Sequence, residues 1–285
     1  MQAFWTGMSA SGPLRDEIFA GNRAVGRVAL DVAVSAGASR RRRVHEEGSL
    51  RVRFPNGDNR STLEAVAINT AGGMAGGDRF SFDIKVAAGA RLMMTTAAAE
   101  KIYRSLGPDT QISVKLEVGQ GGTLAWLPQE TILFDRIRLQ RSIDVELASG
   151  ANLLLAEAVV IGRSAMGEKV ESGWFSDRWR IRIDGKLIFA ETTRLHDKIT
   201  QRLAERAIAG GGAAVAALIK IPGDEDAVAV VRAMQPDFSG EVGISAWNGI
   251  AVARFVAADG ASLRRDLSAV LGVLRTGPLP RLWVN

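Results

Sequence analysis

The amino-acid sequence predicts a mainly β protein, built from layered, solenoid-like stacked β-sheets with a few α-helices near the C-terminus. Apolar and polar residues alternate strictly through the first two thirds of the chain, and a weak internal repeat turns at glycines. Helical patterns appear only after about residue 200. With 285 residues, 47 % of them apolar, the chain can bury a sizeable core. We expect a single domain over 1–285, with a β body over about 20–205 and a helix-containing part over about 206–285.

Five segments of alternating residues predict half-buried strands. In chain order these segments are residues 50–54, 80–86, 112–118, 137–147 and 179–183. The alternating series of the fourth segment reads Ile137, Leu139, Arg141, Ile143, Val145, Leu147.

The internal repeat consists of two alternating apolar residues, a glycine three positions later, and a leucine three positions after that. Its glycines are Gly89, Gly121 and Gly150, spaced 32 and then 29 residues apart. Each unit predicts a strand, a tight corner at which glycine takes a positive φ, and a return strand. Stacked units of this kind form a solenoid, although a meander with similar hairpin corners fits the same pattern.

Two helices are predicted near the C-terminus. Residues 224–234 begin with acidic residues and carry Val228, Val231 and Met234 on one face. In residues 262–276 we expect Ser262 to cap a helix that ends at Gly277 and presents one apolar face, formed by Leu263, Leu267, Val270, Leu271 and Leu274. Apolar alternation resumes at 242–246, so we interpret the glycines at 210–212 as a loop within the domain.

Composition excludes several classes of protein. The absence of cysteine excludes disulfides, thiolate metal sites and cysteine nucleophiles. No run of 18 apolar residues is present, and the first 25 residues lack a secretory signal pattern. We therefore expect a soluble, cytoplasmic protein without a membrane partner.

The charge balance raises the alternative of a basic, β-rich nucleic-acid-binding protein. The net charge is +5, and 29 of the 36 basic residues are arginine. However, the basic block at 40–43 contains no interleaved aromatic residue on which a base could stack. We interpret this block as a solvated loop or a partner-facing patch, and we expect no nucleic-acid partner.

The sequence contains few catalytic signals, and we expect no enzyme activity. Its two histidines, His45 and His196, lie near no nucleophile motif. The glycine-rich segment 69–79 precedes a strand and lacks the spacing of a phosphate-binding loop. A hydrolase remains a third alternative, with two of Asp78, Glu157 and Glu191 as acid and base.

The glycine-rich segment, Asn-Thr-Ala-Gly-Gly-Met-Ala-Gly-Gly-Asp-Arg, resembles the signature of the UreD (UreH) family of urease accessory proteins. Further similar stretches follow in the same order, at residues 95–105, 127–134, 161–168 and 179–195. The chain departs from the family at Ala71, where proline is usual, and at residues 97–98, where Pro-Gly is usual. Both departures affect local turn geometry.

The resemblance implies a non-catalytic chaperone that binds apo-urease, recruits UreF and, through it, the GTPase UreG, and assists nickel insertion. It also implies a mostly β fold. Without cysteine and with few histidines, the chain would hold nickel weakly through carboxylates, so we expect transient nickel and no tightly bound cofactor.

Three sets of residues follow as candidates. Asp78, Glu100, Glu157 and Glu191 are candidates for a polar nickel path, with ion pairs to Arg163 and Arg194 as the alternative for Glu157 and Glu191. Gly72, Gly73, Gly76 and Gly77 are expected to be required by backbone geometry. Leu267, Leu271 and Leu274 are candidates for a UreF-binding stripe, unless that stripe only covers the sheet.

Overall fold

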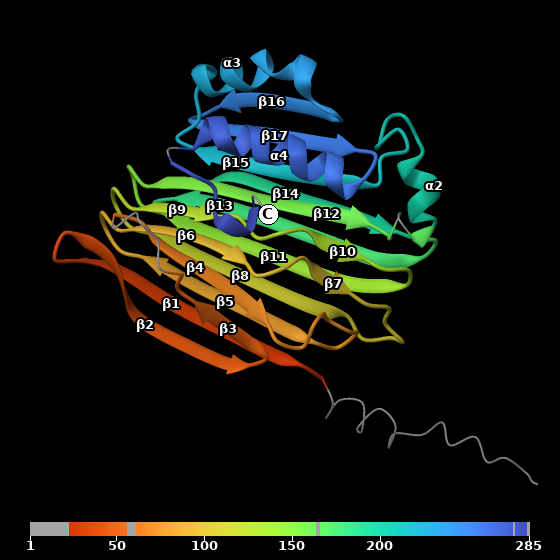
Figure 1. Ribbon diagram of the computed structural model, residues 1–285, viewed down its shortest axis with the longest axis horizontal. Coiled ribbons are helices and arrows are strands. Elements are labelled where there is room, and N and C mark those ends of the chain that lie inside the picture. The colour runs from red at the N-terminus through yellow and green to blue at the C-terminus, as the bar shows by residue number, and fades with distance from the viewer. Residues whose placement is uncertain (1–22, 56–60, 164–165, 276, 284–285) are drawn as a thin grey trace, which may run out of the picture.

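The computed structural model describes residues 23–55, 61–163, 166–275 and 277–283. Within these residues the strands form two stacked sheets, of seven and ten strands. Figure 1 shows the sheets face to face, with α3 and α4 beside the last strands of the larger sheet. Among the described residues, no helix has the length and apolar character that a membrane span requires.

The order of strands in each sheet runs against the chain, except that β2 lies outside β1 and β16 lies outside β17. The seven-stranded sheet has the order β14 (Lys186–His196), β13 (Gly173–Ile183), β11 (Ile137–Leu147), β8 (Thr110–Val118), β5 (Arg79–Val86), β1 (Val25–Ser35) and β2 (Ala38–Gly48). The ten-stranded sheet has the order β16 (Glu241–Trp247), β17 (Ile250–Ala257), β15 (Ala214–Ile221), β12 (Asn152–Ile161), β9 (Thr123–Trp126), β6 (Arg91–Thr96), β4 (Leu63–Asn69) and β3 (Leu50–Arg53), with β10 (Thr131–Leu133) between β12 and β7 (Glu100–Ile102).

The chain winds as a solenoid, which confirms the predicted fold class. Strands β5, β8, β11 and β13 pair in parallel in one sheet, and β4, β6, β9 and β12 pair in parallel in the other. Each passage from β5 to β6, from β8 to β9 or from β11 to β12 crosses between the sheets. A meander would instead pair successive strands antiparallel, so that alternative is wrong.

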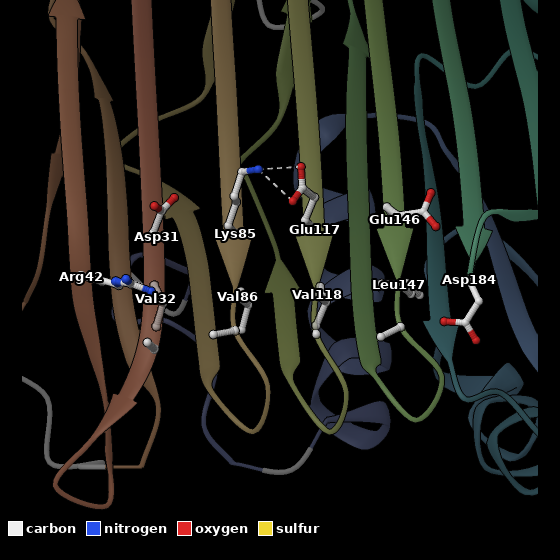
Figure 2. A pocket seen from close by; sticks show the side chains of 14 residues that line it. Asp31, Val32, Arg42, Lys85, Val86, Glu117, Val118, Glu146, Leu147 and Asp184 are labelled. Atoms are coloured by element: carbon white, nitrogen blue, oxygen red, sulfur yellow. Dashed lines mark hydrogen bonds and ion pairs between the residues drawn. The ribbon is translucent and has the colours of Figure 1, made fainter.

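The repeated glycines form the short corners at one edge of the solenoid. Gly89, Gly121 and Gly150 have φ values of +67°, +64° and +76°. Figure 2 shows Val86, Val118 and Leu147 side by side at the strand ends, each followed by one of these corners. On the outer face nearby, Lys85 Nζ lies 2.9 Å from both carboxylate oxygens of Glu117. This edge is therefore compact, and it carries an ion pair between Lys85 and Glu117 on its outer face.

The opposite edge carries the long connections. Parallel strands β4, β7, β10 and β12 end there, and each continues through a loop into the other sheet. The described residues of these loops are 70–78, 103–109, 134–136, 162–163 and 166–172. We call this side of the molecule the loop edge.

The C-terminal part continues the larger sheet, because β15 pairs antiparallel with β12. Helices α3 (Glu225–Ala233) and α4 (Gly260–Leu274) cover the outer face of β15, β16 and β17, and the short α2 (Ile199–Leu203) follows β14. The expected cap of α4 was wrong by three residues. Asp259 is the N-cap, and its carboxylate accepts a hydrogen bond from the Ser262 backbone N–H. A carboxylate accepts this bond well and favours the positive end of the helix dipole.

The interpretation of residues 40–43 as a loop was also wrong. They lie in β2, the edge strand beside β1, and all four arginine side chains are exposed. Charged residues on an edge strand protect it from pairing with other chains, which explains how a strand can carry them.

Candidate functional site

A buried ionic cluster joins the two sheets near the middle of the solenoid. Arg141 on β11 donates from Nη1 to Glu157 on β12 and from Nη2 to Asp177 on β13, the latter at 2.6 Å. The indole Nε1 of Trp126 donates to Glu157 Oε1 at 2.8 Å. The three charged side chains are at most 8 % exposed. Two carboxylates thus share one guanidinium inside the protein.

The cluster is not fully satisfied. Arg141 Nε and Asp177 Oδ1 are buried and have no hydrogen-bond partner among the described residues. Burial raises the pKa of Glu157, and Arg141 opposes that shift. The fully ionised cluster carries one excess negative charge, so it favours a cation or a proton from outside.

A cavity of about 270 Å³ extends from this cluster toward the surface. Arg141, Glu157 and Asp177 line it, together with Glu191 on β14 and Arg254 on β17. Glu191 and Arg254 form an ion pair in which the two side chains are 30 % and 56 % exposed. The cavity therefore connects a buried carboxylate cluster with a partly exposed carboxylate.

Glu100 belongs to the same layer between the sheets. In the parallel register Glu100 on β7 stands beside Thr131 on β10, and Thr131 stands beside Val159 on β12. Register partners in a parallel sheet share one face, so Glu100 lies on the inner face. The Thr131 hydroxyl is 3.3 Å from Arg141 Nη1, and Asn69 Nδ2 donates to Glu100 Oε1 at 2.9 Å. Burial raises the pKa of Glu100 to about 7.

Asp78 has a different environment. Its two carboxylate oxygens accept from the backbone N–H groups of Ala24 and Ala75, at 2.8 and 2.7 Å. Asp78 is buried just before β5, where these bonds fix the end of the glycine-rich loop. Three of the four candidate carboxylates thus face the space between the sheets, and the fourth holds a turn.

The partners of the acids differ from those expected. Arg163 pairs with Glu168, and no side-chain hydrogen bond or ion pair of Arg194 is present among the described residues. Glu157 and Glu191 instead pair with Arg141 and Arg254, which are distant in sequence or on another sheet. A signal for Arg141 was present, because an arginine at an inward position of an alternating strand must be buried with a carboxylate.

The glycines of residues 72–77 allow close packing at the loop edge. Gly72, Gly73 and Gly77 have φ values of +76°, +151° and +93°. A Cβ on Gly73 would lie 2.4 Å from the Tyr103 ring, and one on Gly76 would lie 2.0 Å from Ser105 Oγ. The Tyr103 hydroxyl donates to Gly72 O at 3.2 Å. These glycines therefore let residues 103–105 pack on the loop.

The leucines proposed for partner binding face the sheet. Leu267 and Leu271 are at most 1 % exposed, and Leu274 is partly buried in the same cluster under α4. This stripe covers the outer face of the larger sheet. It is therefore not free to bind a partner.

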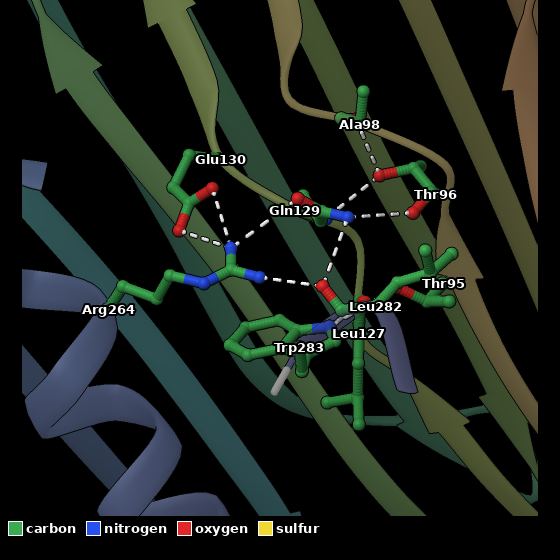
Figure 3. Close-up of polar contacts among 9 residues, drawn as sticks. All are labelled: Thr95, Thr96, Ala98, Leu127, Gln129, Glu130, Arg264, Leu282 and Trp283. Atoms are coloured by element: carbon green, nitrogen blue, oxygen red, sulfur yellow. Dashed lines mark hydrogen bonds and ion pairs between the residues drawn. The ribbon is translucent and has the colours of Figure 1, made fainter. Parts of the chain in front are cut away.

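The C-terminal segment is anchored beside α4, as Figure 3 shows. Trp283 is 3 % exposed, and its Nε1 donates to Leu127 O at 3.0 Å. Arg264 forms an ion pair with Glu130 at 2.9 Å and donates to Leu282 O at 2.8 Å. Trp283 Nε1 also lies 3.2 Å from Thr95 Oγ1, so the 95–105 and 127–134 stretches both contact residues 281–283.

The sequence of this chain matches a known protein family and its members over nearly its whole length. The family model described as UreD urease accessory protein matches residues 24–284. The urease accessory protein UreD of Rhodopseudomonas palustris (strain HaA2) is 57 % identical over 268 residues, covering 94 % of this chain and 96 % of the relative. The UreD protein of Bradyrhizobium diazoefficiens is 54 % identical over 269 residues, with 94 % and 96 % covered. These relatives are named as accessory proteins and not as enzymes. The chain therefore belongs to the UreD family of urease accessory proteins.

Proposed function

We propose that this chain is a urease maturation scaffold that binds apo-urease, recruits UreF and the GTPase UreG, and lets nickel pass toward the urease active site. The observation that carries the proposal is the row of carboxylates between the sheets. Glu100, Glu157 and Glu191 face this layer, and the cavity of about 270 Å³ joins the last two. Asp177, which the sequence did not single out, lines the same cavity.

The chemistry of the row suits a cation in transit. Single carboxylates and a threonine hydroxyl bind Ni²⁺ more weakly than imidazole or thiolate sets do. Among the described residues, no group of three or more His, Asp or Glu side chains could hold a metal ion. We expect nickel to be handed along the row as cargo.

Arg141 determines whether a cation can pass. Its guanidinium occupies the space between Glu157 and Asp177, so a divalent cation must compete with it for both carboxylates. A cation at Glu100 must likewise displace a proton, because the pKa of Glu100 is about 7. Nickel should therefore pass along the row of carboxylates more slowly at acidic pH.

The test is urease activation by Glu157→Gln, Glu191→Gln and the double variant, with Glu117→Gln on the outer face as a matched control. Complex assembly with apo-urease and UreF, and the nickel content of the urease, are measured alongside activity. Intact complexes with reduced nickel in urease support the path. Full activation by the double variant removes these acids from the function, and lost complexes or a lost fold make them structural.

A further inference from the structure

The loop edge carries an arginine-rich surface with an aromatic base. The rings of Tyr103 and Phe134 meet edge to face with centroids 5.1 Å apart, and the Arg163 guanidinium lies 4.4 Å from the Phe134 centroid. These residues line a shallow depression of about 470 Å³ together with Arg104 and Arg136. Aromatic and arginine side chains in this arrangement are typical of the central residues of protein interfaces.

The backbone holds Arg136 in an unusual conformation. Its φ is +59°, in the left-handed region that non-glycine residues rarely adopt. The Arg136 N–H donates to Ser172 O at 3.0 Å, and its carbonyl accepts from Ser105 N–H at 2.9 Å. Two neighbouring loops therefore fix an arginine whose side chain is 71 % exposed. These backbone bonds therefore fix the position from which the Arg136 side chain projects into solvent.

The free charge of the surface is positive. Asp135 Oδ1 accepts from the backbone N–H groups of Glu171 and Ser172, at 2.9 and 3.1 Å. Glu168 is paired with Arg163 at 2.8 Å. In the part of the chain that the structure describes, the Arg104 side chain is exposed and has no hydrogen bond or ion pair. Among the residues whose positions are described, the Arg136 side chain pairs only with Asp135, with 3.5 Å between Nε and Oδ2.

The loop edge also carries an exposed apolar side chain. Leu106 is 82 % exposed in the loop that also contains Arg104. A partner complementary to this surface would carry carboxylates next to an apolar socket. A phosphate backbone fits less well, because Asp135 and Glu168 lie between the arginines and would repel it.

We propose that the loop-edge surface formed by Tyr103, Arg104, Leu106, Phe134, Arg136 and Arg163 docks an acidic surface of apo-urease. This inference rests on the proposed function, and it chooses apo-urease because the relatives are named as accessory proteins of urease. The loop edge also follows directly on β7, which begins with Glu100, so the docked partner would lie next to one end of the carboxylate row.

The experiment measures binding of purified apo-urease to the full chain at 50 and 300 mM salt. The test variant is Arg104→Glu/Arg136→Glu. The matched control is Lys115→Glu/Arg194→Glu, which changes the net charge equally on the outer face of the seven-stranded sheet, away from the loop edge. Arg136→Gly is a further variant, since glycine fits the positive φ and removes only the side chain. Leu106→Ser tests the apolar contact.

We expect the test variant to bind apo-urease at least tenfold more weakly at low salt, and the control to remain within twofold. Arg136→Gly and Leu106→Ser should each weaken binding severalfold while melting like the wild type. Equal binding by the wild type and the test variant overturns this inference alone. The inference is also overturned if the control variant weakens apo-urease binding to the same extent. It is overturned as well if the test variant loses binding of UreF, or of an RNA probe, while its binding of apo-urease is unchanged. If the wild type fails to bind apo-urease, the proposed function fails first.

Discussion

Arg141 on β11 and Glu157 on β12 form an ion pair across the two sheets, with side chains 3 % and 5 % exposed. The pair therefore lies inside the solenoid at the inner end of the cavity, where both charges are largely shielded from bulk water. Asp177 shares the same guanidinium, so the arginine balances two acids.

Arg141→Met should lower the free energy of unfolding by about 3–5 kcal/mol, because it leaves two carboxylates buried without a cation. Glu157→Gln should cost about 1 kcal/mol or less, since Arg141 and Asp177 remain a neutral pair. Urea denaturation of both variants at pH 7 measures the difference. If the free energy of unfolding falls equally in the two variants, the Arg141 guanidinium does not balance both carboxylates.

Glu100 should make the chain less stable as the pH rises. Its pKa is about 7 in the folded protein, against an ordinary value of 4.5, so between these values the folded state holds a proton that the unfolded state has lost. Stability contributed by the neutral carboxyl is lost as pH increases through this window. Glu100→Gln should remove this slope and raise the melting temperature above pH 7. Thermal melts from pH 5 to 8 provide the test, and an unchanged slope would refute the prediction.

Gly73→Val should destabilise the chain by roughly 2–5 kcal/mol, because its Cβ would overlap the Tyr103 ring and its φ suits only glycine. Gly72→Ala is the matched control. Nothing lies within 4 Å of a Cβ at Gly72, so only the positive φ opposes the substitution, at about 1–2 kcal/mol. Denaturant midpoints of the two variants should differ accordingly, and similar midpoints would mean that the ring moves aside easily.

Trp283→Ala should lower the free energy of unfolding by about 3–5 kcal/mol, or release the C-terminal segment from the sheet. Limited proteolysis distinguishes these two results, because a released segment is cut before the rest unfolds. Trp247→Ala removes the same type of side chain at a position that is 41 % exposed, and it should stay within about 0.5 kcal/mol of the wild type.

Much of the fold could be predicted from the sequence because the solenoid repeats one local rule. Gly89, Gly121 and Gly150 each mark a corner where the chain changes sheet, and a spacing of about 30 residues is a property of the sequence alone. Strand β2 was missed because the charges at 40–43 hide the alternation of an edge strand. That strand is stabilised by its neighbour and not by a buried face of its own.

The candidate site was less predictable, since its geometry depends on contacts between the sheets. Glu157 and Glu191 could be singled out as carboxylates in apolar segments. Arg141 could be recognised as an arginine at an inward strand position, but its pairing with Glu157 could not. Arg254 could not be identified as the partner of Glu191, because it lies 63 residues away on a strand of the other sheet. Asp177 was overlooked although it stands at an inward position of β13, between Phe175 and Trp179.

The winding of the chain also determines how the molecule opens. Within the parallel part, each strand pairs only with the strands of the preceding and following coils, so cooperativity passes from neighbour to neighbour along a one-dimensional stack. Strands β2 and β16 end their sheets and have one neighbour each, whereas β8 and β9 have coils on both sides. Amide hydrogens should therefore exchange first in β2 and β16, and the solenoid should fray inward from its two ends while its centre remains intact.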